Sequence, residues 1–352
     1  MQTMNDNLWL FHVTRKNKYY HMKQIAIIIL TSLIYVSCNP PARPPASNEE
    51  TTTQKPAVQV PDFNSDSAYE SVRAQLAFGP RVPNTPAHAR CAAFLTGKLK
   101  TYSANVVVQK GTIRAYNGTP LKFQNIIASW KPETNNRILL CAHWDSRPYA
   151  DHDPDPKNRR KPVDAANDGA SGVGVLMEVA RQLSLVSPSV GVDIILFDVE
   201  DYGPPQDQTM NNADEQWGLG SQYWAKNPHK PDYFARYGIL LDMVGAKNAT
   251  FLMEGISMQY AADIVKKVWS TANRIGYSSY FLFEQGGYIT DDHVPINKIR
   301  NIPTIDLIHL DKNSETGFYP YWHTTGDTFD KIDKNTLKIV GQTLLTVIYE
   351  EQ

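Results

Sequence analysis

The sequence predicts an α/β fold: a single globular domain with a central, mostly parallel twisted sheet and helices on both faces. Short and almost wholly apolar runs, such as residues 137–142 and 192–197, are typical of strands that are buried on both faces. Segments with helical apolar spacing alternate with these runs, which is the pattern of a parallel sheet covered by helices. The chain shows no internal repeat and no sign of a second domain.

The expected elements follow in order along the chain. Residues 69–77 and 88–99 have the spacing of amphipathic helices, and the turn-forming residues 79–83 separate them. Residues 106–109 and 124–130 are β-branched or apolar runs of strand length. Further strands are predicted at 137–142, 192–197, 237–241 and 302–308, and further helices at 174–183, 261–275 and 334–350.

The first residues of the chain have the features of a secretory signal. Residues 25–36 form an apolar run after Met22 and Lys23 that is too short to span a bilayer and resembles a secretory signal. The run ends in Val-Ser-Cys, similar to a lipoprotein cleavage box. We therefore predict a lipoprotein signal peptide at 22–37 and a lipid anchor at Cys38. An uncleaved anchor helix is the alternative.

The flanking segments complete this organisation. Residues 1–21 are best explained as an extension upstream of the true start, and residues 38–62 as a flexible tether without an apolar pattern. Residues 63–352 are the folded domain. The predicted location is the cell envelope of a Gram-negative-type bacterium, lipid-anchored and facing either the periplasm or the surface.

Charge and cysteine content exclude some classes of protein. The 35 basic and 36 acidic residues nearly cancel, so neither a nucleic-acid partner nor binding to a membrane surface through charge is expected. With Cys38 acylated, Cys91 and Cys141 remain. Two buried free thiols are the favoured reading, and one disulfide is the alternative. We expect a monomer.

Each predicted core strand is followed by side chains that are able to bind a metal. These are His143, Asp145, Asp168, Glu200, Asp201, Asp242 and His323. Because ligand sites of open α/β sheets lie beyond the carboxyl ends of the strands, we expect these groups to gather at one edge. A single Asp or His in such a place is more often a helix cap or a core residue, so the prediction depends on their convergence. Nitrogen and carboxylate ligands without thiolates suit catalytic zinc.

Six sequence blocks strengthen this interpretation. They lie at residues 143–146, 166–173, 197–201, 240–246, 291–295 and 322–324. In this order, over residues 65–350, they resemble the superfamily of zinc aminopeptidases and glutaminyl cyclases. The resemblance implies a zinc aminopeptidase/phosphorylase-hydrolase-like fold and a catalytic zinc domain at 63–352. It also implies one zinc ion on Asp168, Asp201 and His323, with Glu200 as general acid and base.

The resemblance is closer to the cyclase branch, which would convert N-terminal glutamine of peptides or proteins to pyroglutamate and release ammonia. Trp322 before the last ligand resembles the cyclase pocket wall, and Trp144 and Trp217 are weaker candidates for that wall. The 240–246 and 291–295 blocks also have the cyclase form, in which Asp291 and Asp242 would share protons with Glu200.

Two alternatives remain open. Aminopeptidases of this superfamily hold a second zinc with the equivalents of His143 and Asp242 and a shared Asp168, and all three residues are present. Asp145 would support this second site. A dizinc aminopeptidase is therefore the first alternative, and a non-catalytic envelope module is the second.

The chain departs from the animal cyclases at two positions. Asp201 stands where they have Glu, so a shorter side chain must reach the metal. Asp306 stands where they have His, which puts the pH dependence in doubt but not the metal site.

Overall fold

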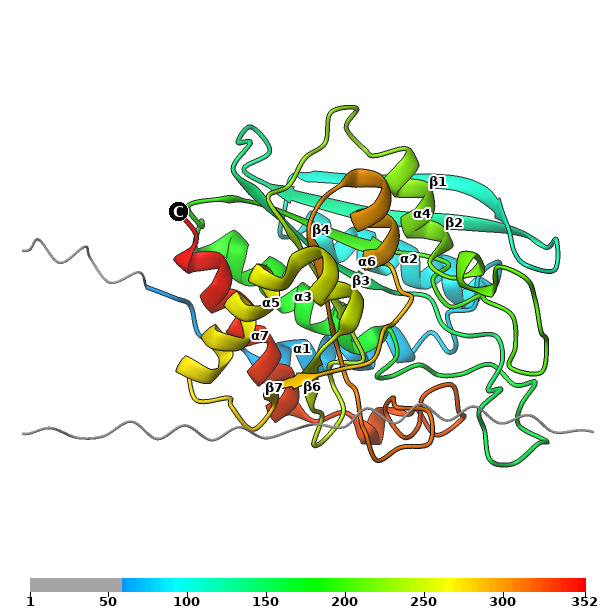
Figure 1. Ribbon diagram of the computed structural model, residues 1–352. Helices are drawn as coiled ribbons and strands as arrows, with labels where there is room; N and C mark the ends of the chain where they lie inside the picture. Colours follow the sequence, from blue (N-terminus) through cyan, green and yellow to red (C-terminus); the bar gives the residue numbers. More distant parts are fainter. Residues whose placement is uncertain (1–58) are drawn as a thin grey trace, which may run out of the picture. The chain divides into compact units, whose positions relative to one another are not determined.

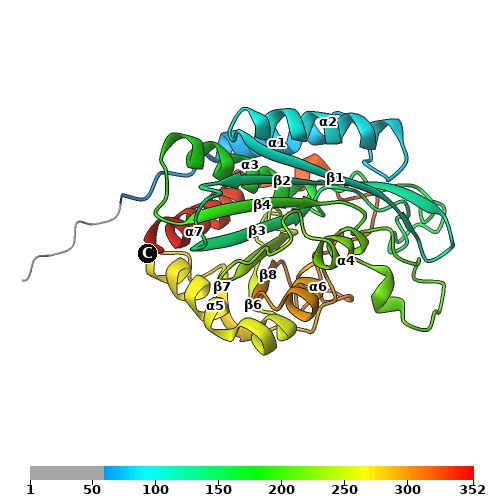
Figure 2. The same ribbon diagram turned by 90° about the horizontal axis from the view of Figure 1, so that it is seen from above.

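Six strands form the central sheet in the spatial order β1-β2-β4-β3-β5-β8 (Figures 1 and 2). The computed structural model describes residues 59–352. The strands are β1 (Asn105–Arg114), β2 (Pro120–Trp130), β3 (Arg137–His143), β4 (Gly191–Phe197), β5 (Gly238–Asp242) and β8 (Thr304–Ile308). β1 and β2 are antiparallel, as are β2 and β4, whereas β4, β3, β5 and β8 run parallel. The predicted α/β fold with a mostly parallel sheet is confirmed.

Helices cover both faces of this sheet. The first face carries α1 (Ser65–Leu76), α2 (Pro86–Lys100), α3 (Ala170–Leu185), α5 (Gly255–Arg274) and α7 (Lys334–Glu350). The second face carries α4 (Leu219–Lys226) and the short α6 (His293–Pro295), which lie together on the side away from α1 and α2 in Figure 2. A two-stranded sheet of β6 (Phe251–Met253) and β7 (Phe281–Gln285) flanks this arrangement.

The apolar runs of the sequence have the burial that their composition predicts. In β3, Ile138 and Leu140 pack into the core of the first face, whereas Leu139 and Cys141 pack into the core of the second. Side chains of a strand alternate between the two faces of a sheet. A strand that is covered on both faces is therefore expected to be apolar along its length, as residues 138–142 are between the polar ends Arg137 and His143.

The carboxyl ends of the parallel strands bring the polar residues of the sequence to one edge. β3 ends at His143, β4 is followed by Glu200 and Asp201, and β5 ends at Asp242. Asp168 stands two residues before α3, at the end of the long loop after β3. Because these strands are parallel, the residues at their carboxyl ends lie together at one edge of the sheet.

The predicted tether ends earlier than residue 62. The Pro61 and Asp62 carbonyls accept hydrogen bonds from Gln342 and Gln182 (3.1 and 3.0 Å), so both residues already belong to the domain. The predictions for residues 1–21, 22–37 and 38–58 lie outside the described residues.

Two further expectations concern segments within the described part of the chain. Cys91 and Cys141 are both buried and carry free thiols, which is the favoured reading of the sequence. Among residues 59–352, none of the helices has both the length and the apolar character that crossing a bilayer requires.

Candidate metal centre and active site

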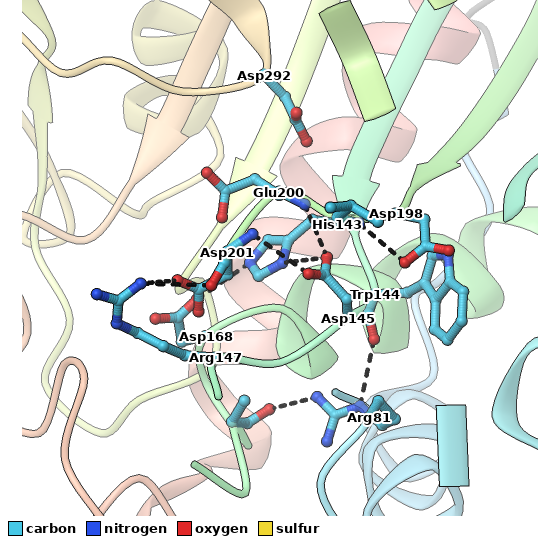
Figure 3. A network of polar contacts seen from close by, with 12 residues as sticks. Arg81, His143, Trp144, Asp145, Arg147, Asp168, Asp198, Glu200, Asp201 and Asp292 are labelled. Atoms are coloured by element: carbon cyan, nitrogen blue, oxygen red, sulfur yellow. Dashed lines mark hydrogen bonds and ion pairs between the residues drawn. The ribbon is translucent and has the colours of Figure 1, made fainter. Parts of the chain in front are cut away.

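Three side chains from three separate segments meet at the carboxyl edge of the sheet. Asp168, Asp201 and His323 each offer one ligand atom, and these atoms lie within 4.8 Å of one another. Figure 3 shows the carboxylates of Asp168 and Asp201 side by side. The Nε2 atom of His323 lies 3.2 Å from Asp201 Oδ1 and 3.7 Å from Asp168 Oδ2.

The chemistry of this group fits a metal ion. All three residues are at most 3% exposed, and Asp201 Oδ2 has no hydrogen-bond partner among the described residues. Burying adjacent carboxylates is costly unless a cation compensates their charge. One imidazole nitrogen and two carboxylate oxygens form the three-ligand set of a catalytic zinc with an open position.

Backbone geometry presents Asp168 to this point. Gly169 follows with a φ of +96°, and a Cβ at this position would lie 2.8 Å from the His143 ring, so only glycine fits. The carboxylate of Asp327 accepts hydrogen bonds from the backbone N–H groups of Asn167 and Asp168. The candidate ligand Asp168 therefore lies on a turn whose backbone is held by hydrogen bonds to Asp327.

The turn after β4 presents Glu200 and Asp201 together. Asp145 is fully buried, and its two carboxylate oxygens accept hydrogen bonds from the backbone N–H groups of Glu200 (3.1 Å) and Asp201 (3.2 Å), as Figure 3 shows. In the structure, Asp145 thus supports the turn through its backbone. Asp145 Oδ1 lies 3.5 Å from His143 Nδ1. Asp145 is nevertheless not part of the group of Asp168, Asp201 and His323, nor of the second group described below.

Arg147 and Asp151 form an outer layer that sequence analysis missed. Arg147 donates to Asp201 Oδ1 (3.3 Å) and holds both oxygens of Asp151 at 2.7 Å. Asp151 Oδ1 lies 3.6 Å from the His323 Nδ1 atom. Carboxylates behind a metal-bound histidine fix the orientation of its ring and raise its basicity. Nothing in the spacing of these residues distinguishes them from ordinary loop residues.

A second group lies next to the first. His143 Nε2 is 3.0 Å from Asp168 Oδ1 and 3.3 Å from Asp242 Oδ1, and these three residues also satisfy the geometry for a metal. Although burial alone lowers the pKa of His143, the Asp145 carboxylate at 3.5 Å, the hydrogen bond with Asp168 and the Asp242 carboxylate at 3.3 Å raise it well above its usual range. A protonated His143 imidazole would offset part of the negative charge of Asp168 and Asp242, as a second metal ion would.

Three acidic residues stand beside the metal group with raised pKa values. Burial raises the pKa of Glu200 well above its usual range. Burial and the nearby charge of Asp242 raise the pKa of Asp291 to about 7. Burial raises the pKa of Asp242 to about 6, against the opposing effect of its hydrogen bond with His143. Carboxyl groups that titrate near neutral pH are suited to accept and return protons.

A pocket of about 460 Å³ opens onto these groups, within the size range of small-ligand sites. Glu200, Asp242 and Asp291 line it together with Asp168 and His323. Its aromatic and aliphatic lining consists of Trp217, Met243, Tyr288, Ile289, Ile308, Phe318 and Trp322.

The tryptophans divide between this pocket and the core. Trp322 stacks on the His323 ring at 3.7 Å, and Trp217 lies parallel to the same ring at 5.9 Å. Trp144 does not line the pocket, so its predicted place in the wall is wrong. It is fully buried, stacks on His88 at 4.4 Å and donates its indole N–H to the Gln124 carbonyl.

Asp306, one of the two positions that depart from the animal cyclases, is a buried residue of β8. The Nδ1 atom of His293 lies 4.0 Å from Asp306 Oδ2. The other ring nitrogen of His293 lies 3.3 Å from Glu254 Oε2. Sequence analysis did not single out His293 or Glu254.

Comparisons with known proteins agree with this geometry. Residues 125–348 match the model of peptidase family M28. Glutaminyl-peptide cyclotransferase of Boiga irregularis is 24% identical in an alignment 303 residues long that covers 77% of each chain.

Solved structures from bacteria are more similar. Glutaminyl cyclase of Bacteroides thetaiotaomicron is 54% identical with a TM-score of 0.82, over 84% of this chain and 100% of that one. A Zn-dependent exopeptidase from Parabacteroides distasonis is 56% identical with a TM-score of 0.82, over 83% of this chain and 100% of that one. This chain therefore belongs to peptidase family M28, in a branch that contains bacterial glutaminyl cyclases.

Proposed function

We propose that this chain is a zinc-dependent glutaminyl cyclase, which converts the N-terminal glutamine of peptides or proteins to pyroglutamate and releases ammonia. The main support for this function is the similarity to the Bacteroides cyclase over that protein's whole length. The site supports it, because Glu200 lies beside the group of Asp168, Asp201 and His323 in a pocket lined by aromatic side chains.

The protein's own residues account for the steps of the reaction. Zinc on Asp168, Asp201 and His323 would supply a Lewis acid for the carbonyl of the glutamine side chain. The pocket walls hold the substrate so that its own α-amine lies close to that carbonyl carbon, and this positioning replaces an encounter between two molecules.

Glu200 is the proton carrier in this account. It takes one proton from the α-amine as the nitrogen bonds to the carbonyl carbon. The bond from that carbon to the side-chain nitrogen then breaks, and Glu200 returns the proton so that ammonia leaves. Asp242 and Asp291 share protons with Glu200, which suits their pKa values of about 6 and about 7.

Ammonia release tests this function. The purified protein should release one ammonia for each Gln-Phe amide consumed, should stop after chelation, and should recover when one equivalent of zinc is added. Glutamate as the product would show that water attacks instead, and the proposed reaction would then be wrong.

An aminopeptidase is the second candidate, because His143, Asp168 and Asp242 form a second group able to bind metal. It would need two zinc ions at full activity. The metal content of the active protein separates the candidates: about one zinc per chain supports the cyclase, and two support the aminopeptidase.

We also propose that Cys38 carries a lipid and that the protein is a monomer on the bacterial cell envelope. The signal-like residues 22–37 and the cysteine after them support the anchor. A fatty-acid label should be incorporated into the wild type and not into Cys38→Ala, and the variant should move to the soluble fraction. Light scattering of the domain should give the mass of one chain.

A further inference from the structure

A second and smaller cavity of about 160 Å³ lies next to the active-site pocket. The two share Ile289, Thr316 and Phe318 as lining residues. We call the smaller cavity the side groove. It extends between residues 285–289, which are the last residue of β7 and the segment after it, and the loop at 310–318.

Both walls of the side groove are fixed by hydrogen bonds. On one side, the Gly286 N–H donates to the Met253 carbonyl (2.8 Å), and the Gly287 carbonyl accepts from the Gly255 N–H (2.7 Å). On the other side, the Asp311 N–H donates to the Gly317 carbonyl (2.9 Å). The groove therefore exists before any ligand enters it.

The lining of the side groove is mainly apolar. Leu252 and Leu310 contribute buried side chains, and Phe318 and Ile289 line the side next to the active-site pocket. The charged residue in its lining is Lys312, whose Nζ lies 2.5 Å from the exposed Glu284 carboxylate. This charge is already paired and does not favour an acidic ligand.

We propose that the side groove binds the side chain of the residue that follows the N-terminal glutamine, and that it favours an apolar side chain there. This inference rests on the proposed function. When glutamine occupies the active-site pocket, the next Cα lies about 3.8 Å farther along the chain. The side chain of that second residue would then lie in the side groove, next to the shared lining residues Ile289, Thr316 and Phe318.

The energetics favour an aliphatic second residue. A leucine side chain in the groove would leave water for an apolar surface, whereas glycine gains nothing there. Methylene-sized differences in apolar pockets commonly change kcat/KM by about 10- to 200-fold. We expect the lower end of this range, because the groove is open to solvent at its rim.

Gly287 offers a way to close the groove without disturbing its walls. A Cβ at this position would meet only Ile289 Cδ1, at 3.7 Å, and the backbone is not in the left-handed region. Gly287→Val would therefore place two methyl groups toward the groove. Gly97 in α2 is the matched control, because it is exposed and a Cβ there meets no neighbour within 4 Å.

The test compares Gln-Leu amide with Gln-Gly amide in the wild type, Gly287→Val and Gly97→Val. The wild type and Gly97→Val should show about tenfold higher kcat/KM for Gln-Leu amide, mainly through KM. Gly287→Val should lose this preference, with equal kcat/KM for the two peptides, and an unfolding transition like that of Gly97→Val would show that the variant is folded.

Two results would overturn the inference: equal kcat/KM for both peptides in the wild type, or a preference for Gln-Leu amide that persists in Gly287→Val. A wild type that releases no ammonia from either peptide would instead contradict the proposed function. The two failures are therefore distinguishable.

Discussion

At the residue scale, the centre depends as much on side chains behind the metal group as on the three proposed ligands. Asp151 Oδ1 lies 3.6 Å from the Nδ1 atom of His323, and the Asp151 carboxylate accepts hydrogen bonds from Nε and Nη2 of Arg147. The sequence pointed to Asp168, Asp201 and His323 because each follows a strand or belongs to a recognisable block. It gave no signal for Asp151, because only the folded loop brings that residue behind His323.

Asp151→Asn should lower zinc affinity about tenfold, because it removes the charge that orients and polarises His323. Competition with a chromophoric chelator measures this without any activity. Asp207→Asn is the matched control, since Asp207 is 64% exposed and pairs only with the exposed Arg160. Equal affinities in both variants would show that Asp151 has no role at the metal.

Glu200→Gln should lower kcat by about 10²- to 10⁴-fold, the usual contribution of a general base. The zinc content should stay at the wild-type value, because Glu200 is not among the three proposed ligands. Atomic absorption and ammonia release together test this assignment. Loss of zinc from the variant would make Glu200 a ligand and its role as base wrong.

At the element scale, the sequence located the four parallel strands because each is a short and mostly apolar run, and 334–350 gave α7 with its observed bounds. Of β1 and β2, which are longer and partly polar, it found only 106–109 and 124–130. It missed β6, β7 and α4, which are three, five and eight residues long and too short to establish a period. It also began α5 at residue 261 rather than Gly255. The helix has a non-helical backbone at Ala261 (φ −146°), so its apolar pattern changes there.

The first turn of α5 is capped by Glu254, which also fixes the pocket wall. Its carboxylate accepts hydrogen bonds from the N–H groups of Ile256, Ser257 and Ile289. Although burial alone raises the pKa of Glu254, the His293 ring 3.3 Å away and a hydrogen bond from the Ser257 hydroxyl lower it to about 2. One carboxylate therefore links the helix start to the segment that carries Ile289.

Glu254→Gln should lower the free energy of unfolding at pH 7 by about 2 kcal/mol, the upper range for a helix cap. The stabilisation from the charged form is complete above the unfolded pKa of about 4.3 and disappears as pH falls through the folded pKa. The difference between wild type and variant should thus shrink from pH 5 toward pH 2. Urea denaturation measures it, and a pH-independent difference would contradict this account.

At the scale of the whole molecule, the first described segment closes the core against the last helix. The Phe63 ring packs where a Cβ on Gly341 of α7 would lie 2.1 Å from it, and the Phe63 N–H donates to Gln342 Oε1 (2.9 Å). Sequence reasoning placed the domain start at residue 63, close to this contact. It could not see that Pro61 and Asp62 are also tied down, because their partners lie far along the chain.

Phe63→Ala should cost about 3–5 kcal/mol in the free energy of unfolding, because it empties a site between helices. Phe234→Ala serves as the control, since Phe234 is 55% exposed and its loss should be nearly neutral. Chemical denaturation compares the two variants. A neutral Phe63→Ala would mean that this end of the chain does not contribute to the core.

Mass spectrometry of two peptides tests the central claim most directly. The domain from residue 59 onward, loaded with zinc, would be incubated with one peptide that begins Gln-Phe and another that begins Leu-Phe. We expect the first peptide to lose the mass of one ammonia while the second stays intact. Release of leucine from the second peptide, with the first unchanged, would contradict the account and make this protein an aminopeptidase.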